Sequence, residues 1–158
     1  MNLIYAALTG LMLTAGSLGH IKENPDPVKW NFRVEKSGDK TYIVHCTATI
    51  EDSWHIYAQI QPPSAISEPT KIVFIKSPLF SLNGKVEEKG HPKKQIIEEA
   101  GIEQNTYEKT VDFTQKVIIK DPGAKLNITG TITYQACTDE MCLPPGTLPF
   151  SVPLSNNP

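Results

Sequence analysis

Two cysteines near the carboxyl end of this 158-residue chain have a spacing that permits redox chemistry. Cys137 and Cys142 enclose the run Thr-Asp-Glu-Met at residues 138–141, and a loop of this length commonly closes a β-hairpin. Residues that face each other across a hairpin have Cβ atoms about 4.5–5.5 Å apart, and slight puckering brings them to the disulfide range of about 3.5–4.5 Å. The spacing therefore permits a disulfide without requiring one.

A bond at this place could be an inert staple or a reversible redox couple. The entropic stabilisation that a disulfide gives grows with the loop it closes, and this loop is very short, so the pattern favours a reversible couple. Metal binding is a further alternative, because Cys137, Met141 and Cys142 offer soft ligands that suit Cu(I). A zinc site is disfavoured, because none of the four histidines lies within a few residues of the pair.

The charges around the pair bear on its reactivity. Asp139 and Glu140 lie between the thiols, and no Lys, Arg or His is adjacent in sequence. Negative charge disfavours a thiolate and raises the pKa of a cysteine. We therefore expect the reduced pair to be a slow nucleophile toward arbitrary disulfides and the oxidised pair to be attacked by a partner's low-pKa thiolate.

The third cysteine, Cys46, lies in an alternating run between Val44 and Ala48. Free cysteine is among the most buried residue types, so we expect Cys46 to be a small core residue without a redox role. An odd number of cysteines leaves at least one thiol unpaired.

Short strands separated by turns are expected to position the cysteine pair. Apolar residues in alternating or compact runs predict strands over residues 30–34, 40–50, 54–57, 71–75, 110–119, 125–136 and 147–154. Such a set predicts an all-β fold, an immunoglobulin-like antiparallel β-sandwich with a redox-active cysteine hairpin. Residues 85–109 are charged and lack alternation, so we expect one long charged loop there, with a helical turn within residues 95–100.

The amino terminus predicts export. Residues 3–19 carry no charged side chain and are too short and too interrupted to span a membrane, which predicts a signal peptide over residues 1–19 and an exported domain over residues 20–158. The 15 Lys and Arg against 17 Asp and Glu exclude a polybasic surface for nucleic acid or an anionic membrane. We therefore expect a protein without nucleic-acid partners or a membrane span, in a compartment where disulfides persist.

Residues 134–145, which read Tyr-Gln-Ala-Cys-Thr-Asp-Glu-Met-Cys-Leu-Pro-Pro, resemble the redox hairpin of the N-terminal domain of the thiol:disulfide interchange protein DsbD. The coarse likeness extends over about residues 28–154. It implies a periplasmic thiol–disulfide oxidoreductase that takes electrons from a thioredoxin-like domain, itself supplied by a membrane electron conduit. The electrons would then pass to oxidised periplasmic proteins. We expect no cofactor, and an electron donor on a separate chain.

The resemblance also implies roles for single residues. Cys142 would form the mixed disulfide with partners, and Cys137 would resolve it. Tyr57 matches an aromatic residue near the family's active site, and His55 stands where another aromatic is often found. Tyr134 begins the Tyr-Gln lead of the hairpin.

The family also has a cap loop, in which an acidic pair followed by aromatic residues shields the cysteines. Glu98 and Glu99 match the acidic pair, whereas Ala100 and Gly101 stand where aromatic residues are expected, and Ile102 is the nearest bulky side chain. The loop between the cysteines is one residue shorter than in the best-known members. Shielding by a cap is therefore a point at which this sequence departs from the family.

One alternative function belongs to a different class. A non-catalytic exported β-sandwich could bind a protein or a ligand, with its hairpin held by a structural disulfide or loaded with a soft metal. The reduction potential of the cysteine pair distinguishes this binding module from an electron carrier.

Overall fold

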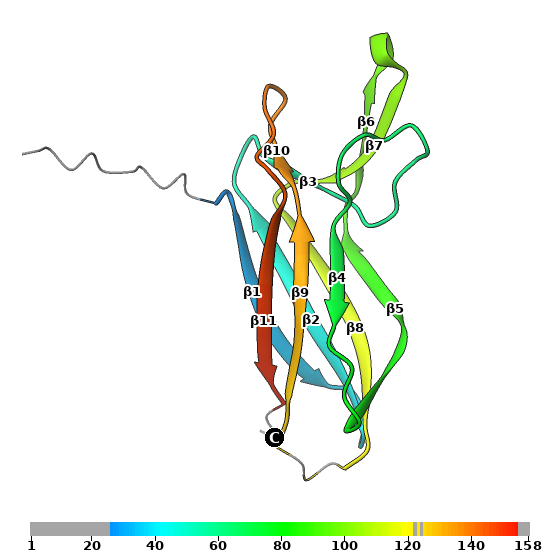
Figure 1. Ribbon diagram of the computed structural model, residues 1–158, viewed down its shortest axis with the longest axis vertical. Helices are drawn as coiled ribbons and strands as arrows, with labels where there is room; N and C mark the ends of the chain where they lie inside the picture. Colours follow the sequence, from blue (N-terminus) through cyan, green and yellow to red (C-terminus); the bar gives the residue numbers. More distant parts are fainter. Residues whose placement is uncertain (1–25, 122, 124, 155–158) are drawn as a thin grey trace, which may run out of the picture.

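A computed structural model describes residues 26–154 except 122 and 124 (Figure 1). The predicted signal peptide at residues 1–19 lies outside the described residues. The described part of the chain consists of strands β1 (Val28–Lys36), β2 (Thr41–Ile50), β3 (His55–Tyr57), β4 (Lys71–Phe74), β5 (Phe80–Gly90), β6 (Lys93–Ile97), β7 (Ile102–Tyr107), β8 (Thr110–Ile119), β9 (Asn127–Tyr134), β10 (Ala136–Cys137) and β11 (Gly146–Pro153), with a 3₁₀ turn, η1 (Glu98–Ala100). No helix of the described residues is long and apolar enough to cross a membrane.

The strands form three antiparallel sheets, in the orders β1-β2-β8-β5, β11-β9-β4 and β10-β3-β7-β6. The first two sheets pack on each other, as aromatic contacts between them show. Trp30 of β1 lies 5.3 Å from Tyr134 of β9, and Phe32 of β1 lies 5.1 Å from Phe150 of β11, measured between ring centroids. The third sheet lies at one end of this sandwich, shown at the top of Figure 1.

Alternation places one face of β2 on the core. Every second side chain of the strand is buried, namely those of Tyr42, Val44, Cys46, Ala48 and Ile50. Period-two burial is what a strand with one face on a core requires. The predicted β-sandwich is confirmed, and its seven predicted strands correspond to β1, β2, β3, β4, β8, β9 and β11.

The prediction of one long charged loop over residues 85–109 is wrong. That segment holds the second half of β5, which rejoins β8 after an irregularity between Asn83 and Glu87, and the hairpin of β6 and β7. The helical turn is confined to η1, because β6 occupies residues 93–97. Most side chains of β6 and of this half of β5 are exposed, so the apolar alternation that marks a strand is absent from their sequence.

Candidate redox site

A disulfide joins Cys137 and Cys142 at the tip of the predicted hairpin. Their Cα atoms are 4.0 Å apart, and the two residues form a bridge of the antiparallel ladder. Backbone hydrogen bonds close the ladder on both sides of the bond: the Leu143 N–H donates to the Ala136 carbonyl at 2.9 Å, and the Thr138 N–H donates to the Met141 carbonyl at 2.8 Å. The hairpin backbone therefore holds the two cysteines face to face.

The two cysteines differ in their access to solvent. Cys137 lies in β10 and is 1% exposed, whereas Cys142 is exposed. Met141, beside Cys142, is 52% exposed. Since exchange requires a thiolate to approach a disulfide sulfur directly, Cys142 is the more accessible of the two residues for such an attack.

Thr138 holds the loop between the cysteines in a tight turn. Its Oγ1 accepts hydrogen bonds from the backbone N–H groups of Glu140 and Met141, at 3.2 and 3.1 Å. Asp139 and Glu140 consequently extend into solvent. Among the residues that the structure describes, no three His, Cys, Asp or Glu side chains are grouped so that they could hold a metal ion.

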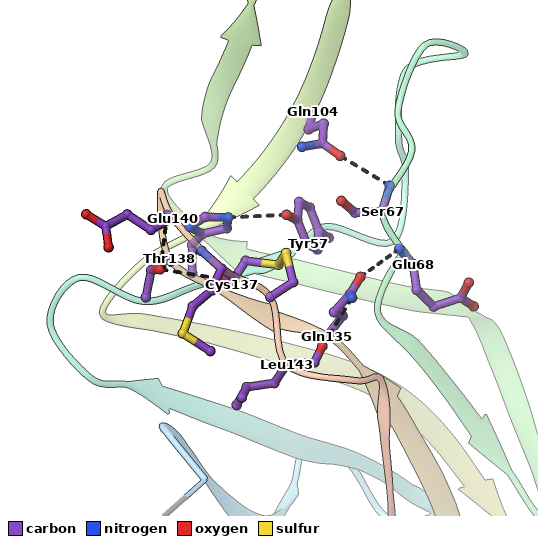
Figure 2. The surroundings of a disulfide bond; sticks show 12 residues. Tyr57, Ser67, Glu68, Gln104, Gln135, Cys137, Thr138, Glu140 and Leu143 are labelled. Carbon is purple, nitrogen blue, oxygen red and sulfur yellow. Dashed lines mark hydrogen bonds between the residues drawn. A yellow bond between two sulfur atoms is a disulfide. The ribbon is translucent and has the colours of Figure 1, made fainter. Parts of the chain in front are cut away.

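Strand β3 lies beside Cys137 and contributes two aromatic rings. His55 is the partner of Cys137 in the β3–β10 ladder, and Figure 2 shows Tyr57 beside the disulfide. The His55 Nε2 lies 3.3 Å from the Tyr57 hydroxyl, and both side chains are buried. Burial lowers the pKa of His55, and the charges of Asp139 and Glu108 partly oppose this shift. No histidine is adjacent to the cysteines in sequence, but the fold places one directly opposite Cys137.

Gln135 ties the hairpin to the segment between β3 and β4. Its side-chain amide donates to the Leu143 carbonyl at 3.1 Å, and its Oε1 accepts from the Glu68 N–H at 3.3 Å (Figure 2). A second glutamine, Gln104 of β7, accepts from the Ser67 N–H at 3.2 Å. These bonds fix the third sheet and the hairpin relative to each other. Sequence reasoning missed both glutamines, and the Tyr-Gln lead of the hairpin was the available signal for one of them.

Residues 24–153 match the family described as "Thiol:disulfide interchange protein DsbD, N-terminal". The chain belongs to this DsbD N-terminal family. The resemblance inferred from the hairpin motif is thereby confirmed.

A solved structure with a TM-score above 0.5 supports this fold at low sequence identity. The N-terminal periplasmic domain of ScsB from Proteus mirabilis is 16% identical with a TM-score of 0.56, over 84% of this chain and 47% of that one, so this chain spans about half of that domain. The reduced DsbD N-terminal domain of Neisseria meningitidis is 15% identical with a TM-score of 0.43, over 79% of this chain and 83% of that one. No protein with a curated description matches this chain significantly.

Tyr134, which begins the DsbD-like motif, lies in the core at the base of the hairpin. Its hydroxyl donates to the Asp26 carboxylate and its ring packs on Trp30. Burial and the Asp26 carboxylate raise the pKa of Tyr134. The side chain therefore supports the strand that leads to Cys137, and its predicted supporting role at the redox site stays a prediction.

Glu98 and Glu99, the acidic pair predicted to belong to a DsbD-type cap, form the 3₁₀ turn between β6 and β7. Both are exposed, and Gly101 ends the turn with a φ of 64°. Figure 1 shows this tip at the same end of the molecule as the cysteine hairpin but standing apart from it. Their role as a cap stays a prediction.

Cys46 is buried as predicted, and its thiol is free. Burial, with a smaller contribution from the Asp112 charge, raises the pKa of this thiol to about 12. Because the thiolate is the reactive form, we expect iodoacetamide at pH 8 to leave Cys46 unmodified in the folded, reduced protein while Cys142 is alkylated. Mass spectrometry of proteolytic peptides measures both sites, and denatured protein, in which Cys46 should react, is the control. Alkylation of Cys46 at the rate of Cys142 would contradict the prediction.

Proposed function

We propose that Cys137 and Cys142 form the dithiol–disulfide couple of a periplasmic electron relay. A thioredoxin-like donor reduces this couple, and oxidised exported proteins accept its electrons. The observation that carries this proposal is the disulfide at the hairpin tip, between an exposed Cys142 and a buried Cys137. Membership of the DsbD N-terminal family supports both the periplasmic location and the class of partners.

Reduction begins at the exposed sulfur. A donor thiolate attacks Cys142 Sγ, the bond between the two sulfurs of the hairpin breaks, and Cys137 leaves as a thiolate that takes up a proton. A second donor thiol then attacks the intermolecular disulfide, releasing reduced Cys142 and an oxidised donor. Two electrons and two protons have then moved to the domain.

Delivery of electrons runs through the same bonds in the opposite order. The Cys142 thiolate attacks a partner's disulfide, and Cys137 then attacks Cys142 Sγ to expel the partner as a thiol. Asp139 and Glu140 place two carboxylates in the loop between the cysteines, which disfavours thiolate formation there. Reaction with a specific partner therefore depends on docking that aligns the sulfurs of the two proteins. Unrelated disulfides, which do not dock, would oxidise the reduced pair only slowly.

The reduction potential tests this proposal. We expect the pair to open and close reversibly against thioredoxin and defined glutathione mixtures, with a potential between about −270 and −120 mV, the range of thioredoxin-like proteins. Alkylation followed by mass spectrometry reads the fraction reduced. A Cys46→Ala variant should give the same potential, which excludes a contribution from the buried thiol.

A bond that stays closed in strongly reducing mixtures, below about −300 mV, is the behaviour of a structural disulfide. That result would reject the relay. It would leave the non-catalytic binding module as the function.

A further inference from the structure

The proposed relay requires Cys137 to lose a proton in a place that disfavours its thiolate. Cys137 is 1% exposed, and burial in low dielectric favours the neutral thiol. In the step that expels a reduced partner, this thiol must nevertheless become the attacking thiolate. A proton acceptor close to Cys137 would remove this obstacle.

His55 is placed for this task. It lies directly opposite Cys137 in the β3–β10 ladder, and Cβ atoms of directly opposed residues are about 4.5–5.5 Å apart on the same face. The imidazole is itself buried, and the Tyr57 hydroxyl contacts its Nε2 at 3.3 Å. The ring is thus held at the ladder position opposite the cysteine whose protonation must change.

The groups that surround His55 suit a transient positive charge. Burial favours the neutral imidazole, which is the form that can accept a proton. Asp139 of the hairpin loop and Glu108 after β7 act on the ring as negative charges that favour the imidazolium. Tyr57, on the same strand, is its neutral hydrogen-bonding neighbour.

We propose that His55 accepts the proton of Cys137 when Cys137 resolves the mixed disulfide, and returns it when the reaction runs backward. The Cys137 Sγ–H gives its proton to the imidazole, and the thiolate attacks Cys142 Sγ. The bond from Cys142 Sγ to the partner's sulfur breaks, and the partner leaves with the electron pair as a thiolate. The imidazolium then gives up its proton, so that the products are the hairpin disulfide and a partner thiol. This inference rests on the relay proposed above.

An aromatic disulfide, 5,5′-dithiobis(2-nitrobenzoate), separates the two steps in the reduced protein. Attack by Cys142 releases the first coloured thiolate, and resolution by Cys137 releases the second. A Cys137→Ala variant defines the first phase, because it should release no second equivalent. Stopped-flow absorbance between pH 5 and pH 9 gives each phase its own pH profile.

In the wild-type protein we expect the second phase to rise to an inflection below the ordinary histidine value of about 6.5 and then to stay level through neutral pH. His55→Phe keeps an aromatic ring against Tyr57 but has no basic nitrogen. Its second phase should be about 100-fold slower at pH 7 and should rise steadily with pH, without the inflection. Its first phase should match the wild type, whereas a merely structural defect in the hairpin would alter both phases.

A second pair of variants tests the charge argument at exposed positions, where folding is not at risk. Asp139→Asn removes a carboxylate that favours the imidazolium, so the inflection should move to lower pH. Glu140→Gln alters the neighbouring loop carboxylate, which is not among the charges acting on His55, and should leave the inflection unmoved.

His45→Gln is a separate control at a buried histidine, which contacts Asp112 at 2.6 Å in the first sheet. This variant should also keep the wild-type profile.

The outcomes separate the two proposals. Identical second-phase profiles for the wild type and His55→Phe would overturn the role of His55 and leave the relay standing. If His55→Phe does not fold, an inflection that Asp139→Asn fails to move decides against His55 in the same way. A wild-type protein with no second phase would overturn the relay itself and this inference with it.

Discussion

A Cys137→Ala variant will accumulate covalent complexes with its partners, and a Cys142→Ala variant will form almost none. The exposed Cys142 thiol of the first variant can attack a partner's disulfide, but nothing remains to resolve the product. The second variant retains only the buried thiol of Cys137 at the hairpin, which a partner cannot approach. Both variants should lose electron transfer completely. Non-reducing electrophoresis of periplasmic extracts, repeated after dithiothreitol, measures the complexes.

The two variants control for each other, because each lacks the hairpin disulfide and retains Cys46. A difference between them therefore reports the position of the remaining thiol. Cys46→Ala, in the otherwise intact protein, should leave electron transfer unchanged. Equal trapping by Cys142→Ala would show that the difference in exposure does not determine which sulfur meets the partner.

Replacing Phe113 with Ala should lower the free energy of unfolding by about 3–5 kcal/mol. Phe113 of β8 is 1% exposed and contacts Trp30 and Tyr107, with ring centroids 5.8 and 6.4 Å apart. It thus joins the sandwich to β7, the strand that pairs with β3 beneath the disulfide. The loss is a large share of the stability of a typical domain, about 5–15 kcal/mol. Urea unfolding followed by tryptophan fluorescence measures it.

Val73→Ala is the matched control, because this β4 side chain is 59% exposed and its truncation leaves no buried cavity. We expect a change within about 0.5 kcal/mol. A Phe113→Ala variant as stable as Val73→Ala would mean that the ring is not part of the packing that supports the third sheet.

The sandwich could be predicted because its strands present one face to a core. In β2, the buried side chains of Tyr42, Val44 and Cys46 recur at every second position, and that pattern survives in the sequence. The hairpin of β6 and β7 offered no such pattern: Lys93 and Lys94 are exposed neighbours, and each pairs with a glutamate across the hairpin. The charged sequence of these exposed strands was therefore interpreted as a loop. The strands were recognised only from their pairing in the structure.

The candidate site was predictable to the extent that it is local. The spacing of Cys137 and Cys142 was sufficient to predict a hairpin that permits a disulfide. The position of His55 depends on the register between β3 and β10, which joins segments far apart in the chain. Local patterns do not encode such a register. The resemblance to DsbD placed His55 near the active site, but its position directly opposite Cys137 and the burial of Cys137 came from the structure.

The backbone hydrogen bonds on either side of the disulfide bear on how partners would bind the domain in the proposed relay. Because the Leu143–Ala136 and Thr138–Met141 bonds hold the hairpin tip without help from sulfur, its outline will be nearly the same in both redox states. A partner that recognises this outline will then dock equally well on the reduced and on the oxidised domain. In the proposed relay, the oxidised and reduced forms of the domain would then compete for the same docking sites. When those sites are saturated, the rate of electron transfer would depend on the ratio of the two forms.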